Sequence, residues 1–103
     1  MKTYKKFKDI PLANPTYQDM WYASFDSPQP RTLGHKLFIP KETGSGFITM
    51  AFNAAYKYGT TMVDLKRWTG FKLLMEHGGI ENQIFGWPHF HLLPVAKNEK
   101  ETI

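Results

Sequence analysis

Two histidines separated by one residue, His89 and His91, are the clearest candidates for chemistry in this 103-residue sequence. They lie in the run Trp87-Pro88-His89-Phe90-His91-Leu92-Leu93-Pro94. Side chains on a β-strand alternate between its two faces, so we expect Trp87, His89 and His91 to share one face while Phe90 packs on a core. A rigid strand that presents two imidazoles side by side suits catalysis or ligand binding.

The residues of this pair leave three interpretations open. In nucleophilic catalysis, a neutral imidazole attacks an electrophilic phosphorus while a neighbouring group orients its second nitrogen. In a metal site, the pair and a third histidine, either His35 or His77, would bind zinc with one position open. A histidine pair can also serve packing alone.

Other polar residues lie where they would approach the pair. His35 follows a loop glycine and begins an expected strand, which would bring it to the same site. Gln83, just before the histidine strand, would donate an amide hydrogen bond to a bound oxyanion. Asp26, at the end of another expected strand, would accept hydrogen bonds from sugar hydroxyls, although aspartate is also a common turn-former.

The elements that position these residues follow from local patterns. Strands are expected at residues 20–25, 36–40, 71–76 and 83–94. Residues 45–67 predict one long helix, with Ser45 as its N-cap and an apolar stripe that includes Gly59. A glycine inside a helix costs about 1 kcal/mol relative to alanine, and close approach of the helix to a sheet would offset that loss. This order of elements predicts an α+β domain in which the helix covers an antiparallel sheet.

Length and composition predict a single domain over residues 1–103. No cysteine is present, which excludes disulfides and thiol chemistry and favours a cytoplasmic location. No run of eighteen apolar residues and no apolar signal segment occur, so we expect no membrane contact. The net charge of +4 fits a phosphate-bearing ligand or nucleic acid. Residues 1–15 are expected to form a solvated basic arm, and residues 95–103 a charged tail.

The motif around the pair resembles the signature of the histidine-triad (HIT) superfamily of nucleotide hydrolases and transferases. That signature alternates three histidines with apolar residues and ends in two apolar residues, often followed by proline. With Leu92-Leu93-Pro94 as that ending, His91 matches the third histidine and His89 the middle one. Trp87 falls at the first position, and Gln83 falls where the family often has a glutamine.

A second block upstream also resembles the family. Residues 25–30 followed by residues 34–41 match a segment in which an acidic residue holds the ribose and a histidine enters the site before a strand ending in proline–lysine. The long helix and the strand after it fall in the family's order, so the resemblance covers nearly the whole chain. Glu76 occupies a position where many members have asparagine, and a carboxylate there would repel phosphate or select a different ligand.

The resemblance implies a HIT-like antiparallel sheet of about five strands covered by one long helix. It implies that His89 attacks the α-phosphorus of a nucleotide ester, anhydride or phosphoramidate, and that water resolves the nucleotidyl-histidine. His91 and Gln83 would then hold phosphoryl oxygens, His35 would line the site and Asp26 would contact the ribose. The scheme needs no metal or cofactor, and family members are commonly homodimers.

Three alternatives accompany this expectation. The indole of Trp87 beside the phosphate site would stack on a ligand or block chemistry, which favours a silent nucleotide-binding protein of the same fold. A Pro-His-x-His run also resembles the uridylyltransferase branch, a comparison that makes His91 the nucleophile. Binding of RNA or DNA by the basic arm would fall steeply with salt.

Overall fold

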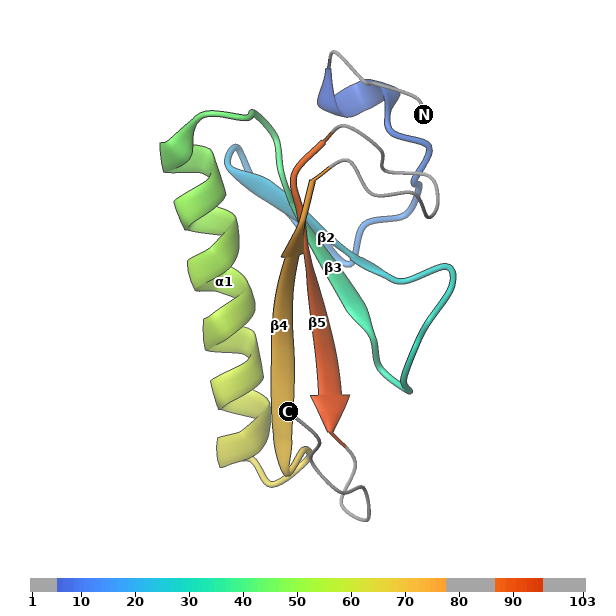
Figure 1. The fold of residues 1–103 in the computed structure, drawn as a ribbon, viewed down its shortest axis with the longest axis vertical. Coiled ribbons are helices and arrows are strands. Elements are labelled where there is room, and N and C mark those ends of the chain that lie inside the picture. The colour runs from blue at the N-terminus through green and yellow to red at the C-terminus, as the bar shows by residue number, and fades with distance from the viewer. Residues whose placement is uncertain (1–5, 78–86, 96–103) are drawn as a thin grey trace.

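The structure is a computed structural model that describes residues 6–77 and 87–95. Its elements are the 3-10 helix η1 (Phe7–Asp9), the strands β1 (Tyr17–Gln18), β2 (Tyr22–Asp26), β3 (Lys36–Pro40), β4 (Gly70–Glu76) and β5 (His89–Val95), and the helix α1 (Ser45–Asp64). The strands form one antiparallel sheet in the order β1-β2-β3-β5-β4, with α1 along one face (Figure 1). The predicted α+β class, with five strands and one long helix, is confirmed.

The ends of the long helix differ from the prediction. Gly44 is the N-cap and makes no side-chain capping bond, whereas Ser45, the predicted N-cap, is the first helical residue. The helix ends at Asp64 rather than at residue 67, because Lys66 adopts a left-handed backbone with φ of 59°. A residue in that conformation ends a helix. In the described part of the chain, no helix has the length and apolar content needed to cross a bilayer.

Residues on the two faces of the sheet pack into separate cores, as strand alternation requires. On the face toward α1, the helix-side core consists of Phe38, Ala51, Ala55, Phe90 and Leu92. On the other face, the arm-side core consists of Ile10, Ala23, Phe25, Leu37, Ile39 and Trp87. The described part of the predicted solvated arm is mostly exposed, but Ile10 is buried and Phe7 and Leu12 pack beside it. The apolar second face of the sheet needs this cover, and the arm provides it.

The last strand begins later than predicted, at His89 instead of residue 83. Pro88 precedes the strand and so removes no ladder hydrogen bond from it, and residues 83–86 lie outside the described part. Pro94 lies within β5 opposite Phe71, beyond the residues that pair β5 with β3. A proline is tolerated there because its missing N–H faces no partner strand on the β3 side.

Gly59 brings the helix into close contact with β4, as the sequence predicted. A Cβ atom at position 59 would lie 2.6 Å from Cε1 of the Phe71 ring, closer than real Cβ atoms approach. We therefore expect Gly59→Ala to lower the free energy of unfolding by about 1–3 kcal/mol, even though alanine favours helix. Gly46→Ala is the matched control, because a Cβ there meets nothing within 4 Å and should be neutral or stabilising. Urea unfolding of both variants measures the difference, and equal stabilities would contradict the close contact.

Candidate active site

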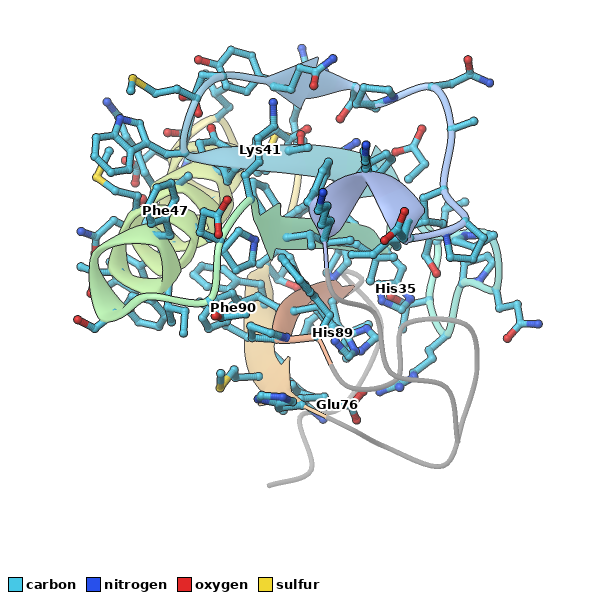
Figure 2. The ribbon with its side chains drawn as sticks, turned by 90° about the horizontal axis from the view of Figure 1, so that it is seen from above. His35, Lys41, Phe47, Glu76, His89 and Phe90 are labelled. Carbon is cyan, nitrogen blue, oxygen red and sulfur yellow. The ribbon has the colours of Figure 1, made fainter. Side chains whose placement is uncertain are left out.

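The pairing of β5 with its neighbours places the histidines on the face away from α1. In this register His89 lies opposite Glu76 of β4, and His91 lies opposite Leu37 of β3. His35, which precedes β3, reaches the same side, so the three imidazoles gather there. Figure 2 shows His35 and His89 on this side, near Glu76. All three are buried, with 3–6% of their surface exposed. The shared face predicted for the pair is present, and His35 joins it.

One chain of hydrogen bonds fixes where the protons of two histidines lie. The backbone N–H of Arg31 donates to Nδ1 of His35 at 3.1 Å, so Nε2 of that ring carries the proton. This Nε2–H then donates to Nδ1 of His91 at 2.9 Å. His91 must therefore be protonated at Nε2, which donates to Oε1 of Glu76 at 2.7 Å. A backbone amide cannot reverse its role, so it sets the direction of the whole chain.

The pKa shifts of these groups agree with that series of hydrogen bonds. Burial, helped by the neighbouring His91 and Arg31, lowers the pKa of His35 to about 4. Burial and the adjacent His89 lower the pKa of His91, although Glu76 opposes this. Burial would raise the pKa of Glu76, but the hydrogen bond from His91 and the nearby guanidinium of Arg31 help to bring it below its ordinary value. Near neutral pH the site therefore holds two neutral imidazoles beside a carboxylate.

His89 has the geometry of a nucleophile. Its Nδ1 lies 2.8 Å from the backbone oxygen of Trp87, and since a carbonyl only accepts, Nδ1 carries the proton. When this ring is neutral, Nε2 therefore keeps its lone pair; this atom lies 3.4 Å from Oε1 of Glu76. The support for His89 comes from the main chain, so it does not depend on the side chain at position 87. Tryptophan at the first position of the motif leaves this orientation intact.

The other predicted site residues lie elsewhere. The indole of Trp87 is 3% exposed in the arm-side core, and its Nε1–H donates to the Pro40 oxygen at 2.9 Å, so it offers no surface for stacking on a ligand. Asp26 points to the α1 side of the sheet, where it pairs with Lys36 at 2.7 Å. The structure does not bring Asp26 to the histidines, because its position in β2 gives it the opposite face. Gln83 lies outside the described residues.

Two residues of this site were not predicted from the sequence to lie beside the histidines, namely Glu76 and Arg31. Oε1 of Glu76 lies 2.7 Å from Nε2 of His91, 3.4 Å from Nε2 of His89 and 3.6 Å from Nη2 of Arg31. The family resemblance drew attention to Glu76, but its partners depend on the register between β4 and β5. Nothing in the sequence marks Arg31, whose most important contact is made by its backbone.

A metal ion fits the cluster poorly. Glu76, His89 and His91 offer ligand atoms within 4.8 Å of one another, in place of the predicted third ligands His35 and His77. A metal ion bound to Nε2 of His91 would move the proton of that ring to Nδ1 and so reverse the direction of the hydrogen bonds that run from Arg31 to Glu76. The N–H of Arg31 would then face a second N–H on His35, and a buried donor would lose its acceptor.

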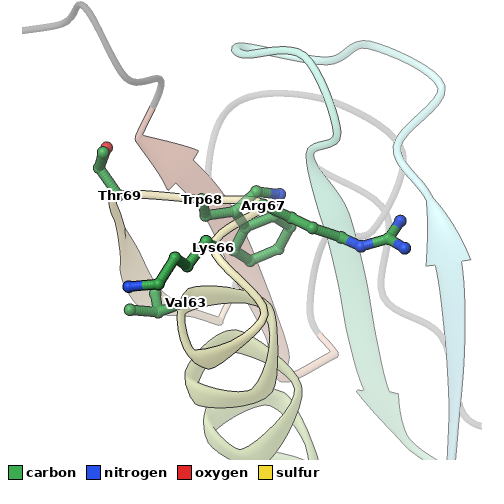
Figure 3. A pocket seen from close by; sticks show the side chains of 5 residues that line it. All are labelled: Val63, Lys66, Arg67, Trp68 and Thr69. Atoms are coloured by element: carbon green, nitrogen blue, oxygen red, sulfur yellow. The ribbon is translucent and has the colours of Figure 1, made fainter.

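A pocket of about 290 Å³ lies away from the histidines, at the end of α1 (Figure 3). Its lining residues are Val63, Lys66, Arg67, Trp68 and Thr69. Thr69 bonds the Val95 oxygen, so this pocket adjoins the opposite end of β5 from His89. It takes no part in the candidate site.

The neutral histidines predict that stability falls with acidification. In the unfolded chain His35 would titrate near its ordinary pKa of 6.5, against about 4 in the fold. Between these values the unfolded state binds more protons, so the free energy of unfolding rises with pH, by about 3 kcal/mol for a shift of this size. Urea unfolding at several pH values from 7 to 4 should show this slope. His35→Gln should make it shallower, and an unchanged slope in that variant would contradict the assignment.

Comparison with known proteins finds the same fold in solved structures. No family model matches the chain, and no curated protein does. A HIT-like protein involved in cell-cycle regulation from Bartonella henselae, crystallised with an unknown ligand, is similar to it with a TM-score of 0.67 and 18% identity, over 86% of this chain and 71% of that one. A HIT family hydrolase from Clostridium thermocellum has a TM-score of 0.63 and 19% identity, over 93% and 90% of the two chains. At such identities the similarity establishes the fold.

Proposed function

We propose that this chain, which has the HIT-like fold, is a nucleotide hydrolase or nucleotidyl transferase that acts at the α-phosphate through His89. The orientation of His89 carries the proposal, since its Nδ1–H is held by a main-chain carbonyl and its Nε2 faces the site. Beside it, Nε2–H of His91 is a donor suited to a phosphoryl oxygen. The similarity to a HIT family hydrolase supports this class of reaction.

The proposed reaction has two displacements. Nε2 of His89 forms a bond to phosphorus while the bond to the leaving group breaks, and the leaving group departs with the electron pair and takes a proton from water. A second water then attacks phosphorus, the P–N bond breaks with its electron pair returning to His89, and the excess proton passes to solvent. His35 is a positioning residue that keeps Nε2 of His91 protonated, which is also why His91 is not the nucleophile.

Trapping the intermediate tests this proposal. The protein is incubated with an adenosine 5′-phosphoramidate, quenched in alkali to preserve P–N bonds, digested and analysed by mass spectrometry. We expect an adenylyl group on His89 together with release of AMP in proportion to enzyme. Folded protein that yields neither adduct nor product would overturn the proposal.

Silent nucleotide binding is the second candidate, and Glu76 is the observation that favours it. Its carboxylate lies against Nε2 of both His89 and His91, where it would oppose the approach of a phosphoryl group. This candidate predicts saturable binding of AMP by calorimetry with no product after long incubation. Product formation that disappears with His89 would eliminate it.

We also propose that two copies of the chain associate through β4. This strand lies at the edge of the described sheet, and Met75 on it is 48% exposed and pairs with Phe90, whose ring packs on the exposed ring of Phe52 on α1. An exposed edge strand with an adjoining apolar patch favours pairing with a second copy. Light scattering should give twice the chain mass of 12.0 kDa for the unaltered protein and one chain mass for Met75→Lys. Met20→Lys, at a methionine that is 72% exposed elsewhere, is the matched control and should stay dimeric.

A further inference from the structure

Glu76 occupies the place that a reacting phosphoryl group needs. An atom poised for attack lies about 3–3.5 Å from its nucleophile, and Oε1 of Glu76 is 3.4 Å from Nε2 of His89. The same oxygen accepts the hydrogen bond that His91 would give to a phosphoryl oxygen. Binding of substrate must therefore displace this carboxylate and take over its hydrogen bond.

The displaced carboxylate cannot go far. Its Cα is fixed by the pairing of Glu76 with His89 across β4 and β5, and the imidazoles on the inner side are buried. Its side chain is 39% exposed and already lies 3.6 Å from the exposed guanidinium of Arg31, so the space open to it is on that outer side. Its negative charge therefore stays near the site, where it can act on charge that develops on the leaving group.

The nature of the leaving group decides whether the charge of Glu76 lowers or raises the barrier to breaking its bond to phosphorus. When a P–O–P bond breaks, negative charge grows on the departing phosphate, and a neighbouring carboxylate raises the barrier. When a P–N bond breaks, the nitrogen takes a proton from water and develops positive charge, which the carboxylate stabilises. The imidazoles of His35 and His91 are neutral and do not cancel this effect, whereas the guanidinium of Arg31, 3.6 Å from Glu76, offsets part of it.

We propose that Glu76 is the specificity-determining residue of this site, which it directs toward nucleoside phosphoramidates of amines and away from dinucleoside polyphosphates; this rests on the function proposed above. Attack by Nε2 of His89 breaks the P–N bond, and the nitrogen keeps the electron pair, gains a proton from water and leaves as the amine. Water then releases the nucleoside monophosphate from His89.

The test compares two substrates in two proteins. The unaltered protein and Glu76→Gln are assayed with an aminohexyl phosphoramidate of AMP and with diadenosine triphosphate. Loss of one nearby charge should lower kcat/KM for the phosphoramidate and raise it for the triphosphate, each by roughly tenfold. The ratio between the substrates should therefore change by about 100-fold. Glu42→Gln, at an exposed glutamate, is the matched control and should leave the ratio unchanged.

The outcomes of this test distinguish the role of Glu76 from the proposed activity of His89 on which it rests. A large change in the ratio in Glu76→Gln, with the melting temperature unchanged, supports the inference. Turnover of both substrates with the same ratio in both proteins, or an equal loss on both, overturns it and leaves the proposed function standing. Turnover of neither substrate by any of the proteins overturns the proposed function, and this inference with it.

Discussion

Replacement of His89 with glycine is expected to reduce turnover of an adenosine phosphoramidate on the order of 10³-fold or more, the scale of loss when a catalytic nucleophile is removed. The reason is chemical, because Nε2 of His89 is the one imidazole nitrogen of the pair that the hydrogen bonds leave with a lone pair toward the site. His91 cannot replace it while the amide of Arg31 keeps its Nε2 protonated. The loss should appear in kcat measured with saturating substrate.

Two comparisons make this result specific. His77→Gly removes an exposed histidine just after β4 and should leave kcat unchanged. Added imidazole should restore part of the activity of His89→Gly, since it can occupy the space left by the ring and attack in its place. Near-normal turnover by His89→Gly would show that another group is the nucleophile.

Truncation of Trp87 to alanine is expected to lower the free energy of unfolding by about 3–5 kcal/mol, as for other large buried aromatic residues. The indole fills the arm-side core at 3% exposure, and its removal also leaves the buried oxygen of Pro40 without its donor. For a chain of this length such a loss lowers the melting temperature by well over 10 °C, at roughly 4–8 °C per kcal/mol. Thermal and urea unfolding measure the change.

Trp87→Phe separates the stability role of this residue from any role in chemistry. It keeps most of the buried surface and the main-chain oxygen that holds His89, so we expect a modest loss of stability with unchanged kcat. Trp21→Ala, at a half-buried ring that packs on Phe47, should cost less than Trp87→Ala. If Trp87→Phe abolished turnover in a folded protein, the indole itself would be part of the reaction.

Much of the fold could be predicted because its signals are local. The alternation around His89 and His91 was sufficient to place both rings on one face, and the apolar stripe through Gly59 indicated both a helix and its contact with a sheet. Boundaries were less accurate, since the end of α1 depends on the left-handed conformation of Lys66. Such a conformation at lysine has no signal in the sequence.

The site was only partly predictable because its remaining members meet through pairing between strands. Whether Glu76 reaches His89 depends on the register of β4 against β5, which the sequence between the two strands does not reveal. Asp26 was misplaced for the same reason, since a change of one residue along β2 would move it to the other face. Arg31 acts through its amide, which every residue other than proline carries.

The packing of the arm has a consequence for how the reacting nitrogen is held. Ile10 packs in the same core as the indole of Trp87, and the backbone carbonyl of Trp87 orients the ring of His89. A protease cut between residues 12 and 16 would therefore disturb the orientation of the His89 ring, more than seventy positions away, without touching the strand that bears it. Protein prepared without this segment would be a poor substitute for the whole chain in any assay.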